Sequence, residues 1–181
     1  MCAKQTTDFA TCTKCHKKTP LKNVWIATDY DGTVKDLVHG YKYERERASA
    51  KSLAMIIDRS LPFLALDTII THVPTATSRV RARGYDHSLL IAKELAKIRG
   101  LKHRAVIGRL GQTQQMGSTR KQRLQQAKKS YVLKKKLDKT TVLLVDDVMT
   151  TGATLTAVAR ELKQAGAKEV FAAVVAHHST K

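Results

Sequence analysis

The 181-residue chain has few aromatic residues, few acidic residues and few cysteines. Its three cysteines are too few, and odd in number, for the disulfide framework that small secreted domains use. A chain of this length buries roughly 70% of its unfolded surface on folding, so it needs no disulfide to hold a core. We therefore expect one globular domain with a small appendage.

Long hydrophobic runs are also missing. No apolar run reaches the roughly 18 to 20 residues that a transmembrane helix needs, and no charged-then-apolar signal segment opens the sequence. The apolar fraction of 43% nevertheless excludes wholesale disorder. We expect a cytoplasmic protein with no membrane insertion.

Negative charge is scarce, since 15 acidic residues face 33 basic ones, for a net charge of +18. Residues 79–139 carry +15 of this excess, whereas residues 1–78 carry +3 and residues 140–181 are neutral. Three interpretations of residues 79–139 stay open: they bind a small phosphorylated ligand, they bind single-stranded DNA, or they are a solvated surface. Single-strand binders usually interleave aromatic residues for base stacking, and this segment has only Tyr85 and Tyr131.

The cysteines lie in a polar N-terminal segment, residues 1–22, which we interpret as the appendage. Cys12 and Cys15 have the Cys-x-x-Cys spacing of half a zinc knuckle, and Cys2 is a candidate third ligand. His16 or His39 would supply the fourth. Because no second Cys-x-x-Cys pair exists, a degenerate knuckle that binds no metal is an equal alternative, and a redox role is weaker.

Hydrophobic periodicity predicts an α/β fold over residues 23–181. The predicted strands are Asn23–Tyr30, Asp67–Val73, Arg104–Leu110, Thr140–Val145 and Glu169–Ala176. The predicted helices are Thr33–Tyr43, Ala48–Ser60, Asp86 or His87 to Ile98, and Thr154–Gln164. A loop rich in Thr and Arg is expected between Pro74 and Asp86. The final strand, helix and strand form a βαβ unit, which requires a parallel sheet.

The most informative segment follows the apolar strand that ends at Val145. Asp146 and Asp147 come first, and the loop Thr150–Thr154 then opens a helix. Ligands of open α/β sheets bind at this edge, and a helix N-terminus with a close-approaching glycine, Gly152, suits a phosphate. Two carboxylates suit sugar hydroxyls or a metal-bound pyrophosphate, so a ribose 5-phosphate satisfies both halves. The alternative is a solvated pair of acids beside an ordinary helix cap.

These residues resemble a known family. The stretch VLLVDDVMTTGAT, from Val142 to Thr154, is similar to the signature of type I phosphoribosyltransferases. The chain as a whole resembles the ComF/GntX-like, competence-associated branch, through Tyr30–Tyr43, through Val73–Ala96 and through Cys12 and Cys15. Gln115 and Arg123 fall where the branch also has a Gln and an Arg. The sequence departs from that branch at Asp86-His87, where Asn-Gln is usual, and at Gln126, where Asn is usual.

The resemblance implies the type I fold, a mostly parallel sheet flanked by helices, and phosphoribosyl pyrophosphate bound with Mg²⁺. Asp146 and Asp147 would hold the ribose hydroxyls, and Arg79 would join them in catalysis. The implied substrate-binding residues are Thr75, Ala76, Thr77, Ser78, Arg83 and Arg123 at the pyrophosphate, and Val148, Met149, Thr150, Thr151, Gly152, Ala153 and Thr154 around the 5-phosphate. Residues Gln112 to Arg120 would close over the site. Zn²⁺ on Cys2, Cys12 and Cys15 is the second implied metal.

Two functional hypotheses result. The first is a phosphoribosyltransferase with an unidentified acceptor. The second is a non-enzymatic, single-stranded DNA-binding competence protein whose sugar-phosphate site is regulatory or vestigial. Both allow an oligomer formed through helix faces, which the sequence does not specify.

Overall fold

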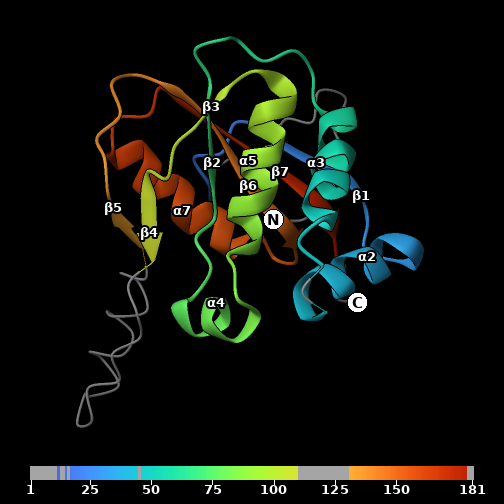
Figure 1. Cartoon of the computed structure of the whole chain (residues 1–181). Coiled ribbons are helices and arrows are strands. Elements are labelled where there is room, and N and C mark those ends of the chain that lie inside the picture. Colours follow the sequence, from blue (N-terminus) through green and yellow to red (C-terminus); the bar gives the residue numbers. More distant parts are fainter. Residues whose placement is uncertain (1–11, 13–14, 16, 45, 110–130, 179–181) are drawn as a thin grey trace, which may run out of the picture.

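The computed structural model describes residues 12, 15, 17–44, 46–109 and 131–178 (Figure 1). A five-stranded parallel sheet lies at its centre, in the order β1-β7-β6-β2-β3. The strands are β1 (Val24–Asp29), β7 (Glu169–His177), β6 (Thr141–Met149), β2 (Ile69–His72) and β3 (Lys102–His103). The expected parallel sheet is therefore confirmed.

Helices cover both faces of the sheet. Helices α2 (Gly32–Tyr43), α3 (Ser49–Ser60) and α5 (His87–Arg99) pack on one face, with α3 and α5 side by side, and α7 (Ala153–Gln164) packs on the other (Figure 1). Strand β6 shows the consequence: Leu143 and Val145 join the α3–α5 side, whereas Val142 and Leu144 join the α7 side. A strand buried on both faces needs a continuous apolar run, which the sequence supplies.

The stretch Arg104–Leu110 does not form the single strand that its composition predicts. The Arg104 amide donates to the Ile70 carbonyl, which continues the pairing of β3, and a tight turn from Arg104 to Val106 follows. The chain then enters a separate antiparallel hairpin of β4 (Ile107–Arg109) and β5 (Tyr131–Leu133), which packs near α7. Two short pairings therefore replace one longer strand.

The segment after Pro74 is a second difference, because residues expected as a loop form the helix α4 (Thr77–Arg83). None of its residues is buried, so no apolar periodicity marks it in the sequence. It ends at Gly84, whose φ of 85° lies in the left-handed region that favours glycine.

Strand β6 also extends beyond its predicted end at Val145. Its pairing with β7 continues to Met149, which lies opposite His177. Asp146 and Asp147 therefore belong to the last part of the strand. After β2 the chain passes through α5 to β3, toward one edge of the sheet. After β6 it passes through α7 to β7, toward the opposite edge. Neighbouring strands with diverging connections open a crevice at their carboxyl ends.

Among the residues that the structure describes, no helix is long and apolar enough to cross a membrane.

Candidate functional site

The acid pair lies near the carboxyl end of β6, next to β2. The Val73 amide donates to the Val145 carbonyl, so the segment leaving β2 runs beside Asp146. Asp146 is half-buried and accepts two hydrogen bonds on Oδ1, from the Ser88 hydroxyl at 2.8 Å and from the Asp147 amide at 2.9 Å. Both donors hold the carboxyl group in one orientation.

The two carboxylates differ in their surroundings. Burial, followed by the neighbouring charge of Asp147, raises the pKa of Asp146 from 3.8 to about 7. Asp147 instead forms an ion pair with Lys42, whose Nζ lies 2.9 Å from Oδ2. Their side chains are only 13% and 17% exposed, respectively. At neutral pH one carboxylate is thus paired with a cation, and the other can hold or release a proton.

The loop after β6 lies next to the acid pair and begins α7. Gly152 has a φ of 71°, which an L-residue adopts only with strain, and it is the N-cap of α7. Thr150, Thr151 and Thr154 are exposed, whereas Gly152 is buried. The first amides of α7 therefore lie beside three exposed threonines, an arrangement that suits an anion. The helix begins at Ala153, one residue earlier than predicted.

The segment leaving β2 is anchored by Asp86. The Asp86 carboxylate accepts from the Thr75 amide at 3.0 Å and from the Thr75 hydroxyl at 2.9 Å. It also caps α5 by accepting from the Leu89 amide. One side chain therefore fixes both the start of α5 and the loop that the family resemblance assigns to pyrophosphate.

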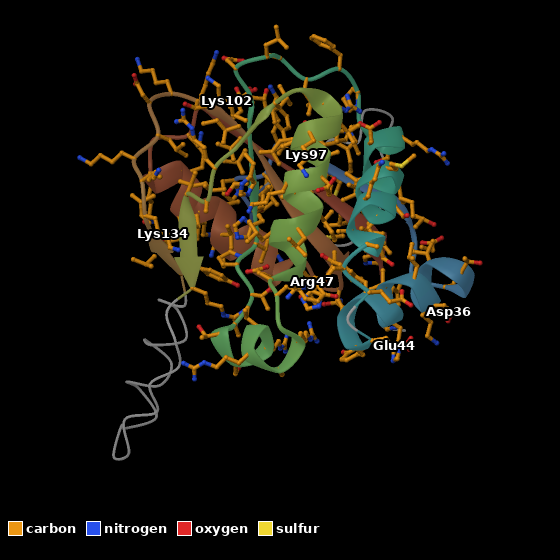
Figure 2. All side chains as sticks on the ribbon, viewed as in Figure 1. Asp36, Glu44, Arg47, Lys97, Lys102 and Lys134 are labelled. Carbon is orange, nitrogen blue, oxygen red and sulfur yellow. The ribbon has the colours of Figure 1, made fainter. Side chains whose placement is uncertain are left out.

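Two of the three arginines that the family resemblance implicates, Arg79 and Arg83, lie on α4. Arg79 is exposed, and Arg83 is half-buried with its guanidinium 4.9 Å from the centre of the Tyr43 ring and 3.4 Å from His87 Nδ1. Burial and then the charge of Arg83 lower the pKa of His87, so this imidazole is neutral at pH 7. Arg47 donates to the Gly84 carbonyl and holds the end of α4; Figure 2 shows it beside that helix.

The structure thus brings together the acid pair, the Thr150–Thr154 loop, Thr75 and Arg83. The sequence did not identify Lys42, Ser88 or the anchoring role of Asp86. Lys42 occurs in the last turn of α2, where a lysine is ordinary, so only its place in the Tyr30–Tyr43 motif could have indicated a role.

Some predicted site residues fall outside the described part of the chain, namely Cys2, Arg123 and the stretch Gln112 to Arg120. Cys12 and Cys15 are half-buried, and the Cys15 amide donates to the Cys12 carbonyl at 2.8 Å. In the described ranges, no group of three or more His, Cys, Asp or Glu residues could hold a metal ion.

Parallel sheets with diverging connections define a class of open α/β proteins that bind ligands at the carboxyl ends of the strands, and a helix N-terminus at that point suits an anion. The model of the phosphoribosyl transferase domain matches residues 86–181, which is more than half of the chain. The protein therefore belongs to the phosphoribosyl transferase domain family.

Several solved structures are similar to this chain, and the likeness to the first one below, whose TM-score exceeds 0.5, supports the fold. A structure described as the allosteric regulatory enzyme of purine biosynthesis is 20% identical, with a TM-score of 0.53 over 71% of this chain and 25% of that one. Glutamine phosphoribosylpyrophosphate amidotransferase from B. subtilis is 18% identical over 74% of this chain and 26% of that one, with a TM-score of 0.48. Purine phosphoribosyltransferase from Pyrococcus horikoshii is 25% identical over 75% of this chain and 74% of that one, with a TM-score of 0.40.

The chain spans about a quarter of the length of the first two structures. No curated protein matched it.

Proposed function

We propose that the protein is a phosphoribosyltransferase of the ComF/GntX-like branch that binds phosphoribosyl pyrophosphate and transfers its ribose 5-phosphate. The observation that carries the proposal is the position of Asp146 and Asp147 beside the Thr150–Thr154 loop, at the point where the connections diverge. The phosphoribosyl transferase domain match includes both features. We assign this domain to residues 23–181, because β1 pairs with β7 in the same sheet, and residues 1–22 to the appendage.

In this proposal each group has a separate task. Asp146 and Asp147 accept hydrogen bonds from the ribose hydroxyls, and the α7 amides with Thr150, Thr151 and Thr154 bind the 5-phosphate. Arg79 and Arg83 bind the pyrophosphate. Asp86 holds the adjacent loop in place through its two hydrogen bonds from Thr75. Charge-assisted bonds from arginine to phosphate are directional, so they orient the leaving group as well as attract it.

The reaction would exchange one bond at C1 of the ribose. The acceptor's lone pair forms the new bond to C1, and the bond from C1 to the pyrophosphate oxygen breaks with its electron pair leaving on pyrophosphate. Positive charge grows on the ribose ring and negative charge on the leaving group. Carboxylates beside the ring and arginines beside the pyrophosphate stabilise both changes, because they are oriented before reaction begins.

The donor set suits Mg²⁺, which favours carboxylate and phosphate oxygens and keeps several waters. Asp146 and Asp147 would offer one or two carboxylate oxygens, and the pyrophosphate the others. When bound, Mg²⁺ supplies additional charge neutralisation at the leaving group. Zn²⁺ on Cys2, Cys12 and Cys15 stays a prediction, since only two of these cysteines are described.

Calorimetry with phosphoribosyl pyrophosphate and MgCl₂ tests the proposal. We expect wild type to bind and Asp146→Ala/Asp147→Ala to lose binding by about a hundredfold or more, because two charged hydrogen-bond acceptors are removed. Asp138→Ala is the matched control, since Asp138 is an exposed carboxylate outside the site. Equal heats from wild type and the double variant would show that the site is assigned to the wrong residues.

A specific surface supports the second hypothesis, binding of single-stranded DNA. A cavity of about 390 Å³ on the outer side of α7 is lined by Lys17, Lys18, Thr19, Pro20, Arg160, Lys163 and Gln164. Four of these side chains are cationic and none is acidic. Within residues 79–139, Tyr85 is buried and Tyr131 half-buried, so base stacking on them is disfavoured and phosphate contacts are favoured.

The salt dependence of binding to single-stranded DNA tests this second function. We expect the logarithm of the association constant to fall with the logarithm of salt concentration, with a slope near −0.7 for each phosphate contact. The variant Lys17→Gln/Lys18→Gln should flatten the slope by about one to two phosphate contacts. A flat dependence in wild type would exclude a phosphate-contact surface.

A further inference from the structure

Tyr131, the first residue of β5, lies against the predicted sugar-phosphate site but has no role in the proposal above. Its half-buried ring packs on the α7 side of the core. It pairs directly with Arg109 of β4, whose guanidinium carbon is 5.6 Å from the centre of the ring. The hairpin therefore fixes the position of the ring from one side and α7 from the other.

Strand β5 contacts α7, and the hydroxyl group of Tyr131 interacts electrostatically with residues from both halves of the site. The side chain of Thr154, the last residue of the phosphate loop, interacts with this hydroxyl group. Burial raises the pKa of Tyr131 above its usual value; Arg109 and Thr154 oppose this rise, and the nearby Asp146 carboxylate adds to it. The phenol therefore keeps its proton at neutral pH and remains a hydrogen-bond donor.

A phenol oxygen accepts hydrogen bonds as well as donating one. Tyr131 can thus accept from Thr154 while its own proton is directed to a ligand. Thr154 lies at the 5-phosphate end of the site and Asp146 at the ribose end, so a sugar phosphate that spans them passes the phenol. The pyrophosphate loop, in contrast, begins at Thr75 and is held from α5.

We propose that Tyr131 is a further binding residue of this site, whose hydroxyl donates a hydrogen bond to the ribose 5-phosphate part of the substrate. Arg109 positions the ring and adds positive charge behind it. This inference rests on the proposed function, because it needs a ribose 5-phosphate between Asp146 and Thr154. If Tyr131 binds the substrate, the β4–β5 pair contributes to the site together with β6 and the start of α7.

Calorimetry with the two parts of the substrate separates this role from a structural one. Ribose 5-phosphate and inorganic pyrophosphate are titrated separately, each with MgCl₂, into wild type and Tyr131→Phe. We expect Tyr131→Phe to weaken ribose 5-phosphate binding about tenfold, the usual effect of losing one hydrogen bond to a charged group. Pyrophosphate binding should not change. Tyr30→Phe is the matched control, because Tyr30 is also half-buried and lies on the other side of the core.

Two results would overturn the inference. Unchanged affinity of Tyr131→Phe for ribose 5-phosphate would show that the hydroxyl does not contact the ligand. An equal loss of affinity for both parts would show that the hydroxyl only supports the structure. Failure of the proposed function gives a different pattern, in which wild type itself binds neither part and the inference falls with it.

Discussion

The high pKa of Asp146 makes the site a source of instability above neutral pH. Between pH 4 and pH 7 an unfolded chain has lost the proton of this carboxyl group, whereas the folded chain still holds it. The unfolded state binds fewer protons, so the free energy of unfolding falls as pH rises through this window and levels off above the folded pKa of about 7. Asp146→Asn removes this dependence and keeps an oxygen that accepts from Ser88.

The size of the effect follows from the pKa. A rise from 3.8 to about 7 sets an upper limit of about 4 kcal/mol, at about 1.4 kcal/mol for each pH unit. Since the side chain is half-buried, water screens part of this cost, and we expect Asp146→Asn to be more stable than wild type by about 2 kcal/mol at pH 8. At pH 4 the two proteins should be nearly equal.

Urea unfolding at pH 4, 6 and 8 measures this difference. The single tryptophan, Trp25, is 4% exposed in β1 and should report unfolding by its fluorescence. Asp138→Asn controls for the loss of one negative charge from a basic protein, because Asp138 is exposed. A difference between wild type and Asp146→Asn that is the same at every pH, or a less stable Asp146→Asn at pH 8, would refute the reasoning. The more stable variant should also bind phosphoribosyl pyrophosphate poorly, as expected if a functional site is maintained at the expense of stability.

Three further predictions concern binding and folding. Affinity for phosphoribosyl pyrophosphate should rise about tenfold from pH 6 to pH 8 in wild type, as Asp146 ionises, and calorimetry should find a smaller rise in Asp146→Asn. Lys42→Gln leaves the partly buried Asp147 without its cation and should cost about 2 kcal/mol in urea unfolding, whereas Lys35→Gln, at an exposed position of the same helix, should change little. Gly166→Ala should lower the melting temperature strongly, because its Cβ would lie 2.2 Å from the Leu137 carbonyl oxygen at a φ of 99°. Gly100→Ala should cost only about 1 kcal/mol, because its Cβ would have no atom within 4 Å beyond its own chain neighbours. Equal melting temperatures for the two glycine variants would contradict this packing argument.

The prediction from sequence succeeded best where a pattern is local. The core strands β6 and β7 and the helix α7 have apolar residues at the spacing that their faces require, so their existence and order follow from periodicity. It failed for α4, which buries no residue and so has no apolar pattern. It also ended β6 too early, because pairing with β7 extends that strand through two acidic residues that strand propensity disfavours.

Taken alone, the sequence determined the order of the core elements, the acid pair and the threonine-glycine loop, because each is written in a short contiguous stretch. Only the tertiary structure decided what surrounds these groups. Ser88 bonds Asp146 across 58 positions of the sequence, and Lys42 reaches Asp147 from α2, which packs on the same face of the sheet as α3 and α5. Such contacts depend on how α2, α5 and β6 pack together, and it is this packing, through burial and neighbouring charge, that gives Asp146 its high pKa.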